Sequence, residues 1–392
     1  MLSRKSVIAG GVGTVALAAL GYRLWDRGAL ALGEGPAYDP WNEWRGRVDD
    51  GPRRPLRAAI LAASPHNTQP WLFEVSGSSV AVTADRARHL GAFDPFRREM
   101  HLGIGCAIEN LVRAARAFGR APAVEPVSGR LEPSPGPEPV LAARISLERN
   151  GPADDALFAA VPQRRTDRGP YRDAPVAPEQ LRALGDLASG PDVRVVFLFD
   201  DGARHELGTV IVDATRRIIT DPDMARDSYH WVRIGRREIL THRDGITIET
   251  SGTTGLVTVA AKVLPDFDEA TTHRSWLATT RDVHTATAAV FGMVLVRDRL
   301  DMAQAIAAGR AWQRLHLAAT AHRLAAQPLN QPVEMMDRNQ MLGRSDTYGP
   351  ALSRLAHAGD WEPTFVFRLG HPTREALHSP RRALTDMIRA SP

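Results

Sequence analysis

The sequence predicts an α+β fold in which helices flank a mixed sheet and one chain forms two pseudo-symmetric halves. Three observations support this prediction. The 392 residues are 43% hydrophobic and 24% charged, a globular composition that excludes collagen-like, low-complexity and wholly disordered chains. Segments with helical and strand-like hydrophobic patterns alternate along the chain. Finally, one predicted helix resembles a second one in the distant C-terminal part of the sequence.

From residue 55 onwards, the hydrophobic pattern defines the elements in turn. Residues 55–63 predict a helix that ends in a loop, and residues 101–118 predict a longer helix with an apolar stripe. The turn composition of residues 76–78 joins two alternating strands. Strands are expected at 71–75, 80–83, 140–147, 193–199, 290–296 and 365–369. The proline-rich stretch 132–139 is expected to be an exposed loop within a half rather than a linker between domains.

The internal similarity concerns residues 104–120 and 308–324. At an offset of 204, six of the 17 positions are identical, and Gly105 falls on Gly309. Two long helices with small residues on one face predict a pair that packs closely across a pseudo-two-fold axis. A repeat of this length is too long for a solenoid. We therefore expect a gene duplication that lets one chain reproduce a dimer, with a first half at 52–150 and a second half at 151–392.

The first 31 residues have the pattern of a targeting segment. Arg4 and Lys5 precede an uncharged stretch, residues 7–20, which is too short for the roughly 20 residues of a spanning helix and matches a signal peptide. The pattern resembles a twin-arginine export signal with Lys5 at the second arginine position. Ala29-Leu30-Ala31 offers a cleavage site, and an uncleaved membrane anchor is the alternative. We expect an exported or membrane-associated protein, with a cytoplasmic location as the other possibility.

Charge and cysteine content exclude several classes of protein. The net charge is +4 and only two of the 49 basic residues are lysines, Lys5 and Lys262. The sequence contains no run of five or more like charges, so we expect no nucleic-acid partner. A single cysteine, Cys106, excludes internal disulfides, and its helix predicts a small buried side chain. The histidines lack metal-binding spacing, so no metal is expected. The Gly103-Ile104-Gly105 stretch follows no good strand, so its glycines indicate helix packing rather than dinucleotide binding.

Two polar segments are candidate binding sites. The first, Ser64-Pro65-His66-Asn67-Thr68-Gln69-Pro70-Trp71, concentrates hydrogen-bonding side chains in a loop, although turn formation alone could explain it. The second, residues 164–168, contains three arginines and Thr166. Guanidinium groups beside a hydroxyl group can bind phosphate oxygens, whereas a solvated basic loop is the alternative. Arg381 and Arg382 form a weaker basic pair near the C-terminus.

Together these motifs resemble the FMN-dependent nitroreductase superfamily. Residues 63–71 are similar to its Ser-x-x-Asn-x-Gln-Pro-Trp signature, and residues 164–168 to its phosphate-binding Arg-Arg-Ser-x-Arg start. Residues 369–372, followed by Arg381 and Arg382, resemble its last strand and basic C-terminal segment. The resemblance covers the chain from about residue 56 to the end. It implies a nitroreductase-like fold with a mixed, mostly antiparallel sheet, and FMN as the cofactor.

The order of the motifs differs from that of the ordinary family, in which the arginine motif comes first. Here the Asn-Gln-Pro-Trp loop precedes the arginine motif. This arrangement resembles the Acg-type, internally duplicated nitroreductase-like proteins. It implies that each half contributes one element to a single complete site, with one FMN per chain and a monomer that imitates the family dimer. Residues about 221–275 exceed a minimal half, and the resemblance favours a lid over a surface excursion.

The resemblance also assigns roles to individual residues. It implies that Arg164, Arg165, Thr166 and Arg168 hold the FMN phosphate, and that Arg381 and Arg382 close around it. Ser64, Pro65 and Asn67 would line the flavin, and Gln69 would contact the ring or brace the loop. No residue is assigned a catalytic role, and His66 falls on a variable position of the motif.

The implied activity is electron transfer from NAD(P)H through the flavin to a nitroaromatic, a quinone or a related small-molecule acceptor. In such enzymes the cofactor carries the chemistry and the protein binds and orients it. Two alternatives remain at this point: an FMN storage protein with a closed lid and little turnover, and a membrane-associated structural protein without a cofactor. The sequence does not choose between NADH and NADPH.

Overall fold

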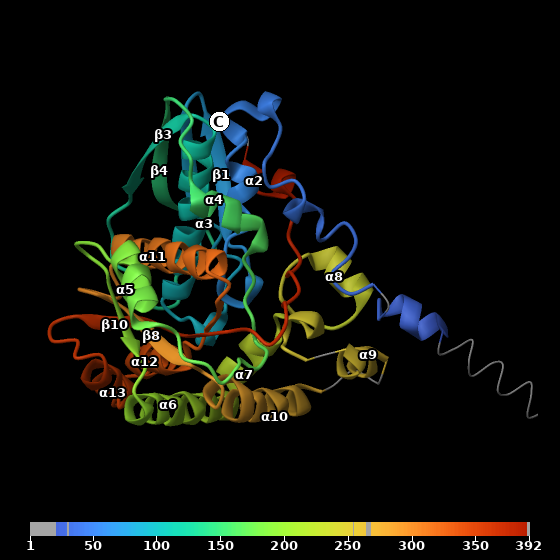
Figure 1. Cartoon of the computed structure of the whole chain (residues 1–392), viewed down its shortest axis with the longest axis vertical. Coiled ribbons are helices and arrows are strands. Elements are labelled where there is room, and N and C mark those ends of the chain that lie inside the picture. The colour runs from blue at the N-terminus through green and yellow to red at the C-terminus, as the bar shows by residue number, and fades with distance from the viewer. Residues whose placement is uncertain (1–20, 30, 254, 264–267, 390–392) are drawn as a thin grey trace, which may run out of the picture.

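The computed structural model describes residues 21–29, 31–253, 255–263 and 268–389. The predicted targeting segment therefore lies mostly outside the described residues. Among the described residues, no helix combines the length and the apolar character needed to cross a bilayer. Figure 1 shows a chain whose two main sheets lie on either side of a central pair of long helices.

The first sheet contains five strands, in the order β11-β1-β2-β4-β3. All neighbours are antiparallel except β1 and β11, which are parallel. The strands are β1 (Trp71–Ser76), β2 (Ser79–Ala84), β3 (Arg120–Pro126), β4 (Val140–Arg149) and β11 (Ile388–Arg389). Since β11 pairs with β1, the C-terminal end of the chain returns to the N-terminal sheet.

The second sheet contains four antiparallel strands, in the order β5-β8-β10-β9. They are β5 (Arg194–Leu198), β8 (Val290–Val296), β9 (Ala325–Pro328) and β10 (Glu362–Gly370). Every residue of β8 is buried, as expected for a strand in the middle of a covered sheet. A separate two-stranded ribbon joins β6 (Val232–Arg233) to β7 (Ile246–Thr247).

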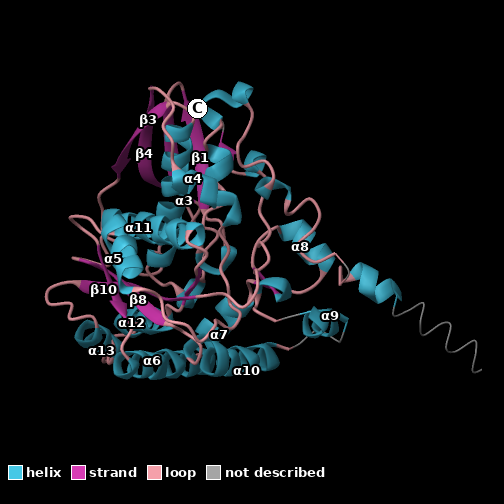
Figure 2. Ribbon diagram, in the orientation of Figure 1, coloured by secondary structure: helices cyan, strands magenta, loops and turns pink. Residues whose placement is uncertain are grey.

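Helices cover both sheets, as Figure 2 shows. Those of the N-terminal part and the centre are α2 (Leu56–Ala59), α3 (Arg98–Ala117), α4 (Ala156–Ala160), α5 (Pro178–Ala188) and α11 (Met302–Ala321). The remaining helices surround the second sheet and the middle segment: α6 (Asp201–Thr220), α7 (Pro222–Tyr229), α8 (Arg236–His242), α9 (Gly255–Val263), α10 (Glu269–Thr279), α12 (Gln331–Met341) and α13 (Tyr348–Leu355). The α+β architecture predicted from the sequence is thus confirmed.

The predicted strands at 71–75, 80–83, 140–147, 193–199, 290–296 and 365–369 are all confirmed within a few residues, as is the long helix at 101–118. The helix predicted at 55–63 is too long, because α2 ends at Ala59. A proline disfavours the helical conformation of the residue before it, and Ser64, before Pro65, is extended at φ −149° and ψ 154°. The proline-rich stretch 132–139 forms the loop between β3 and β4.

The helices α3 and α11 pack directly against each other at the centre of the molecule. A Cβ atom on Gly105 would lie 2.1 Å from the Ile306 carbonyl oxygen, and one on Gly309 would lie 1.9 Å from that of Leu102. These glycines therefore allow two backbones to touch, so the prediction that they pack helices is confirmed. Cys106 is also buried as predicted, and burial raises the pKa of its thiol to about 12.

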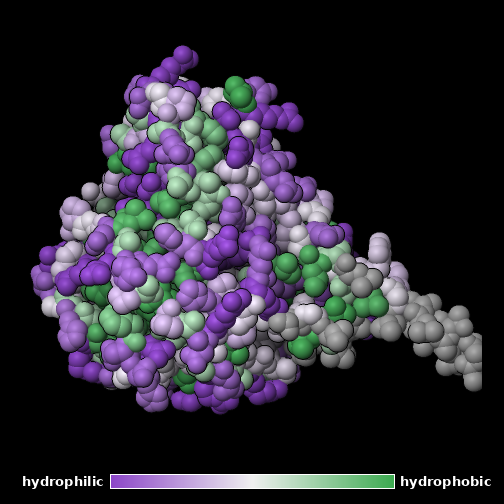
Figure 3. All heavy atoms as spheres, in the orientation of Figure 1, coloured by the Kyte–Doolittle hydropathy of each residue, from purple (hydrophilic) through white to green (hydrophobic). Residues whose placement is uncertain are grey.

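The surface drawn in Figure 3 is largely hydrophilic, with scattered apolar residues. Beneath it lie two clusters of buried hydrophobic side chains. One unites the first sheet with α3 and α11, and the other lies between the second sheet and α6, α12 and α13. The helices α3 and α11 therefore lie between the first sheet and the second sheet. Loops from the regions of both sheets line a cavity beside these helices.

Candidate functional site

A cavity of about 560 Å³ lies where the central helices meet the loops of both parts of the chain. Its volume is in the range of small-molecule sites, which are typically about 300–1,000 Å³. The walls are mainly apolar and include four aromatic side chains from four different parts of the fold, Phe93, Trp276, Trp312 and Phe365. Such a cavity suits a flat, largely apolar ligand whose polar groups face a few polar side chains.

One wall is the loop before β1, whose backbone is unusual. His66, Asn67 and Gln69 have positive φ angles of 46°, 56° and 51°. Residues other than glycine rarely adopt this conformation, and it persists only where surrounding contacts enforce it. The Ser64 hydroxyl accepts a hydrogen bond from the Gln69 amide at 3.0 Å. Because of this fold-back, Ser64, Pro65 and His66 face the cavity.

The same loop is anchored to the C-terminal segment and to the middle segment. Asn67 donates its Nδ2 hydrogen to the Pro380 carbonyl at 3.0 Å and accepts a hydrogen bond from Arg381. The Gln69 Oε1 atom accepts a hydrogen bond from the Arg382 backbone N–H at 2.9 Å, and its Nε2 donates to the Arg243 carbonyl at 2.8 Å. These partners hold Asn67 and Gln69 away from the cavity, so Gln69 braces the loop.

The arginine motif forms a second wall. Thr166 forms an isolated parallel β-bridge with Ala326, so the chain is extended at this point. Side chains in an extended chain alternate between two faces. Thr166 and Arg168 line the cavity. Arg165 instead forms an ion pair with Glu375 at 2.7 Å. Arg164, Thr166 and Arg168 therefore share one face of the segment, and Arg165 lies on the other.

Arg164 and Arg381 form a buried cationic pair behind this wall. Both donate hydrogen bonds to the Leu61 carbonyl, at 3.5 and 3.4 Å, and both lie over the ring of Trp41. Neither lies within ion-pair distance of a carboxylate among the described residues. Burial lowers the pKa of Arg164 to about 10, and its Nε and Nη1 have no hydrogen-bond partner in the described structure. Buried cations normally have a counter-charge, so this pair requires an anion.

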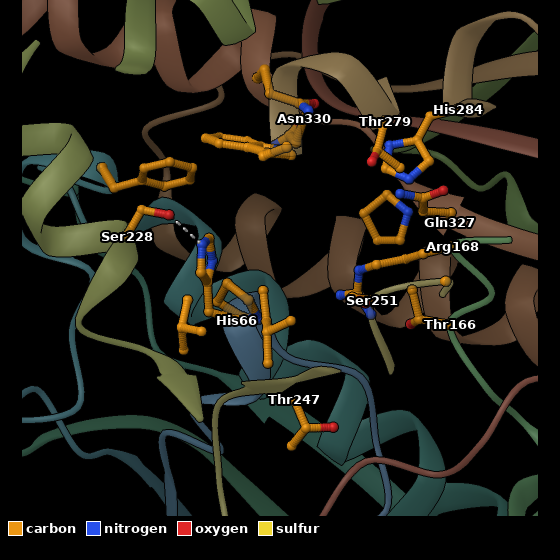
Figure 4. Close-up of a pocket in the computed structure, with 18 of the residues that line it drawn as sticks. His66, Thr166, Arg168, Ser228, Thr247, Ser251, Thr279, His284, Gln327 and Asn330 are labelled. Carbon is orange, nitrogen blue, oxygen red and sulfur yellow. Dashed lines mark hydrogen bonds between the residues drawn. The ribbon is translucent and has the colours of Figure 1, made fainter. Parts of the chain in front are cut away.

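Figure 4 shows that several polar side chains of the cavity gather on one side of it. They include Arg168, Thr166, His284 and Gln327. Burial keeps the pKa of His284 far below its ordinary value, and the charges of Arg368 and Arg168 lower it further. The His284 ring, the Thr166 hydroxyl and the Arg168 guanidinium are available to a polar ligand at this end.

His66 lies on the other side and is linked to α7. Its Nε2 atom lies 3.0 Å from the Ser228 hydroxyl, and its ring packs edge-on against Phe93 at 4.8 Å between centroids. Burial lowers the pKa of His66 to about 3, and the charge of Arg168 contributes. A neutral imidazole therefore connects the 64–71 loop to the segment 221–275.

The structure brings together residues that the sequence analysis selected from distant parts of the chain. Ser64, Pro65, Thr166 and Arg168 line one cavity. Behind the cavity wall lie Arg164, Asn67 and Arg381. Arg164 donates to the Leu61 carbonyl, and Arg381 donates to the Ala62 carbonyl and to the Asn67 side chain. Gln69 and Arg382 brace the loop, and Arg165 points elsewhere. The proposed binding roles of these ten residues remain predictions.

Several cavity residues had no counterpart in the sequence analysis. His284, Trp312 and Phe365 belong to ordinary helical or strand patterns. Glu99 and Glu334 occupy the first turns of α3 and α12, where an acidic residue is expected merely to stabilise the helix end. Only the burial of these two side chains distinguishes them from ordinary acidic residues at a helix start, and burial is not visible in the sequence.

Known proteins that are similar to this chain in sequence include two named as NAD(P)H nitroreductases. The chain is 27% identical over 348 residues to "Putative NAD(P)H nitroreductase Rv3131" of Mycobacterium tuberculosis H37Rv, covering 86% of this chain and 90% of that protein. It is 31% identical over 184 residues to "Putative NAD(P)H nitroreductase acg" of the same strain, covering 45% of this chain and 50% of the relative. The chain therefore resembles proteins named as NAD(P)H nitroreductases, and the Rv3131 protein aligns with it along nearly its whole length.

The similar solved structures include two enzymes titled as FMN-dependent nitroreductases NfnB. The Mycobacterium smegmatis enzyme, solved with NADPH, is 18% identical with a TM-score of 0.38 and covers 60% of this chain and 98% of its own. The enzyme of "sphigopyxis sp. strain HMH" is 19% identical with a TM-score of 0.38, covering 59% of this chain and 97% of its own. No family model matches the chain.

Proposed function

We propose that this protein is an FMN-dependent oxidoreductase that passes electrons from NAD(P)H to a small acceptor such as a nitroaromatic or a quinone. The observation that carries the proposal is the buried pair Arg164 and Arg381, which meets no carboxylate among the described residues and lies beside an apolar, aromatic-lined cavity. The relatives named as NAD(P)H nitroreductases support the same conclusion. No observation on the described residues favours flavin storage over turnover.

The residues present fit the phosphate and the ring of FMN. Arg164 has two buried nitrogens without a partner and Arg381 has one, as counted among the described residues, so they can donate to phosphate oxygens. With Thr166 and Arg168 they would hold the phosphate. Ser64 and Pro65 would lie along the ring, among the aromatic side chains. When bound, the flavin supplies the hydride chemistry, and the protein orients it and excludes water.

Flavin binding tests the phosphate site. Purified wild-type protein is expected to be yellow, with one FMN per chain. From the arginine motif, Arg165→Ala with Arg168→Ala is expected to lose the flavin. Arg164→Ala with Arg168→Ala is the sharper variant, because Arg165 pairs with Glu375 whereas Arg164 and Arg168 share the other face of the segment. Arg172→Ala, an exposed arginine nearby, is the matched control. A yellow Arg164→Ala/Arg168→Ala protein with full stoichiometry would overturn the assignment.

Reduction tests turnover against storage. The yellow protein is mixed with NADPH, and separately with NADH, without oxygen, while the flavin absorbance is followed. Prompt bleaching is expected, followed by recovery of colour when a quinone is added. A flavin that ignores both nucleotides yet bleaches with dithionite would instead identify a storage protein. A colourless preparation that takes up no FMN would exclude both functions.

We further propose that residues 221–275 act as a lid. Gly252 has φ +93°, and a Cβ atom there would lie 2.4 Å from the Arg168 carbonyl, so this segment rests directly on the arginine motif. Ser228 and Thr247 also line the cavity. Hydrogen exchange in this segment is expected to slow when FMN binds. Equal exchange with and without FMN would argue for a surface excursion.

We also propose that the chain is an internal duplication that works as a monomer, since reciprocal α3–α11 contacts relate its halves. Sedimentation should give the mass of one chain, and a stable dimer would contradict this proposal.

Export through residues 1–31 is a separate proposal. Fractionating cells that produce the full chain and a version lacking these residues would test it, because only the full chain should leave the cytoplasm or attach to the membrane.

A further inference from the structure

Two acidic side chains in the cavity wall have no part in the proposed flavin binding. Glu99 of α3 and Glu334 of α12 line the cavity, and each is only 6% exposed. Their carboxyl groups lie within hydrogen-bonding reach of each other. Glu334 Oε2 has no donor partner among the described residues. Since ionised carboxylates are acceptors only, a hydrogen bond between two of them requires a proton on one.

The charged groups around the pair leave that proton in place. Arg98 Nη2 lies 3.6 Å from Glu99 Oε1, but the Arg98 Nε donates at 2.7 Å to Asp337, which also pairs with Arg299. Asp94, at the start of α3, adds negative charge on the same side. The Asn330 amide donates to Glu99. Arg98 therefore lowers the pKa of both carboxyls, but its charge is shared with Asp337 and does not offset the effect of their burial.

Burial is the main reason that the pair is protonated. It raises the pKa of Glu99 to about 7 and keeps that of Glu334 well above the ordinary value, and repulsion from the Glu99 and Asp94 carboxyls raises the pKa of Glu334 further. The only histidine of the 64–71 loop, His66, stays neutral and supplies no counter-charge. A carboxylic acid that keeps its proton near pH 7 at a cavity wall can act as a general acid.

We propose that the Glu99–Glu334 pair donates the proton that the bound electron acceptor takes up when it is reduced. The inference rests on the proposed flavin-dependent function. With FMN bound, the cofactor would supply a quinone acceptor with hydride, that is two electrons and the hydrogen of one O–H bond. The carboxyl O–H bond of the pair would break to form the second O–H bond of the hydroquinone, and the carboxylate would regain its proton from water.

The first test needs no flavin. The carboxylic-acid C=O stretch of the apo-protein is recorded by infrared difference spectroscopy between pH 6 and pH 9. Wild type should show a band that is absent from Glu99→Gln with Glu334→Gln, and Glu206→Gln, an exposed carboxyl on α6, should keep it. A wild-type spectrum without a variant-sensitive band would overturn the proposal.

The second test compares acceptors that do and do not need a proton. Flavin-loaded protein is reduced and then reoxidised by 1,4-benzoquinone or by ferricyanide, which takes an electron alone. We expect Glu334→Gln to slow the quinone reaction on the order of 10²-fold, as for loss of a general acid, and to leave ferricyanide unchanged. Glu99→Gln serves if Glu334→Gln fails to fold, and Glu206→Gln is again the control.

The outcomes separate this inference from the proposed function. Protein that binds no FMN, or whose flavin NAD(P)H does not reduce, contradicts the function and the inference together. Normal flavin reduction with an unchanged quinone rate in both variants contradicts the inference alone. Equal slowing with quinone and ferricyanide also contradicts it, because a structural defect would affect both acceptors.

Discussion

Gly105 of α3 and Gly309 of α11 touch each other's helix backbone in a reciprocal way. Gly105 faces the carbonyl of Ile306, and Gly309 faces the carbonyl of Leu102. At the sequence offset of 204 that matches the two glycines, Leu102 also matches Ile306. The same contact is therefore made twice, as in an isologous interface between two subunits. This relationship places a pseudo-two-fold axis at the helix crossing.

The first prediction concerns this crossing. Gly309→Ala should lower the free energy of unfolding by about 3 kcal/mol or more, because its Cβ would lie 1.9 Å from the Leu102 carbonyl and only a backbone shift can relieve that contact. Gly208→Ala in α6 is the matched control, since its Cβ would meet Thr285 at an ordinary 3.4 Å. Chemical denaturation measures both, and equal stability of the two variants would refute the close packing.

The second prediction concerns Glu109, a buried carboxylate that joins the same two helices. Burial alone would raise its pKa, but Arg314, Arg310 and Arg113 hold the pKa below its ordinary value. Its contribution to stability is therefore present above about pH 4.5 and is lost as the pH falls. Glu109→Gln should cost about 3 kcal/mol at pH 7 and much less in acid. Denaturation curves from pH 3 to pH 8 test this, and a cost that does not change with pH would contradict it.

The third prediction concerns Lys262, the only lysine among the described residues. It forms a buried ion pair with Glu249 and donates to the Arg27 carbonyl at 3.2 Å, so it ties α9 to the N-terminal segment. Lys262→Met should cost about 3 kcal/mol because it strands a buried carboxylate. Adding Glu249→Leu should restore most of the loss. If the double variant were no more stable than the single one, an unpaired Glu249 would not explain the loss.

The fourth prediction concerns the charge of His66. Because burial lowers its pKa to about 3, NMR of the ring nitrogens should show a neutral imidazole from pH 5 to pH 8. The depressed pKa also means that its contribution to stability is present above about pH 6.5, the ordinary value, and is lost as the pH falls. His66→Gln should remove this part of the acid sensitivity. An imidazolium signal at pH 6 would show that the 64–71 loop opens in solution.

Much of the fold could be predicted from the sequence because it depends on local patterns. The strand β8 is a continuous apolar run and α3 carries a periodic apolar stripe, and the positions of both were predicted to within a few residues. The helix before Ser64 was predicted too long, because the apolar run continues past Ala59 while the chain turns there through i→i+3 hydrogen bonds from Leu61 and Ala62. Ser64, Pro65, Thr166 and Arg168 were also found as site candidates, since polar motifs in loops are visible without a structure.

Burial and long-range pairing could not be predicted in the same way. Nothing in the sequence near Glu99 distinguishes a buried carboxyl that meets Glu334, more than two hundred positions away, from an exposed acid at a helix start. The sequence also does not show which arginines of residues 164–168 point into the molecule. Arg165 pairs with Glu375, and Arg164 donates to the Leu61 carbonyl, and both partners are distant in the chain.

The sequence alone therefore determined the elements, the glycine-lined helix pair and the motifs of the family, all of which rest on residues close together in the chain. The tertiary structure decided which of those residues share a cavity, which arginines lack a counter-charge and which acids keep a proton. The physical reason is that desolvation and hydrogen bonding depend on neighbours in space, and the sequence specifies those neighbours only through the completed fold.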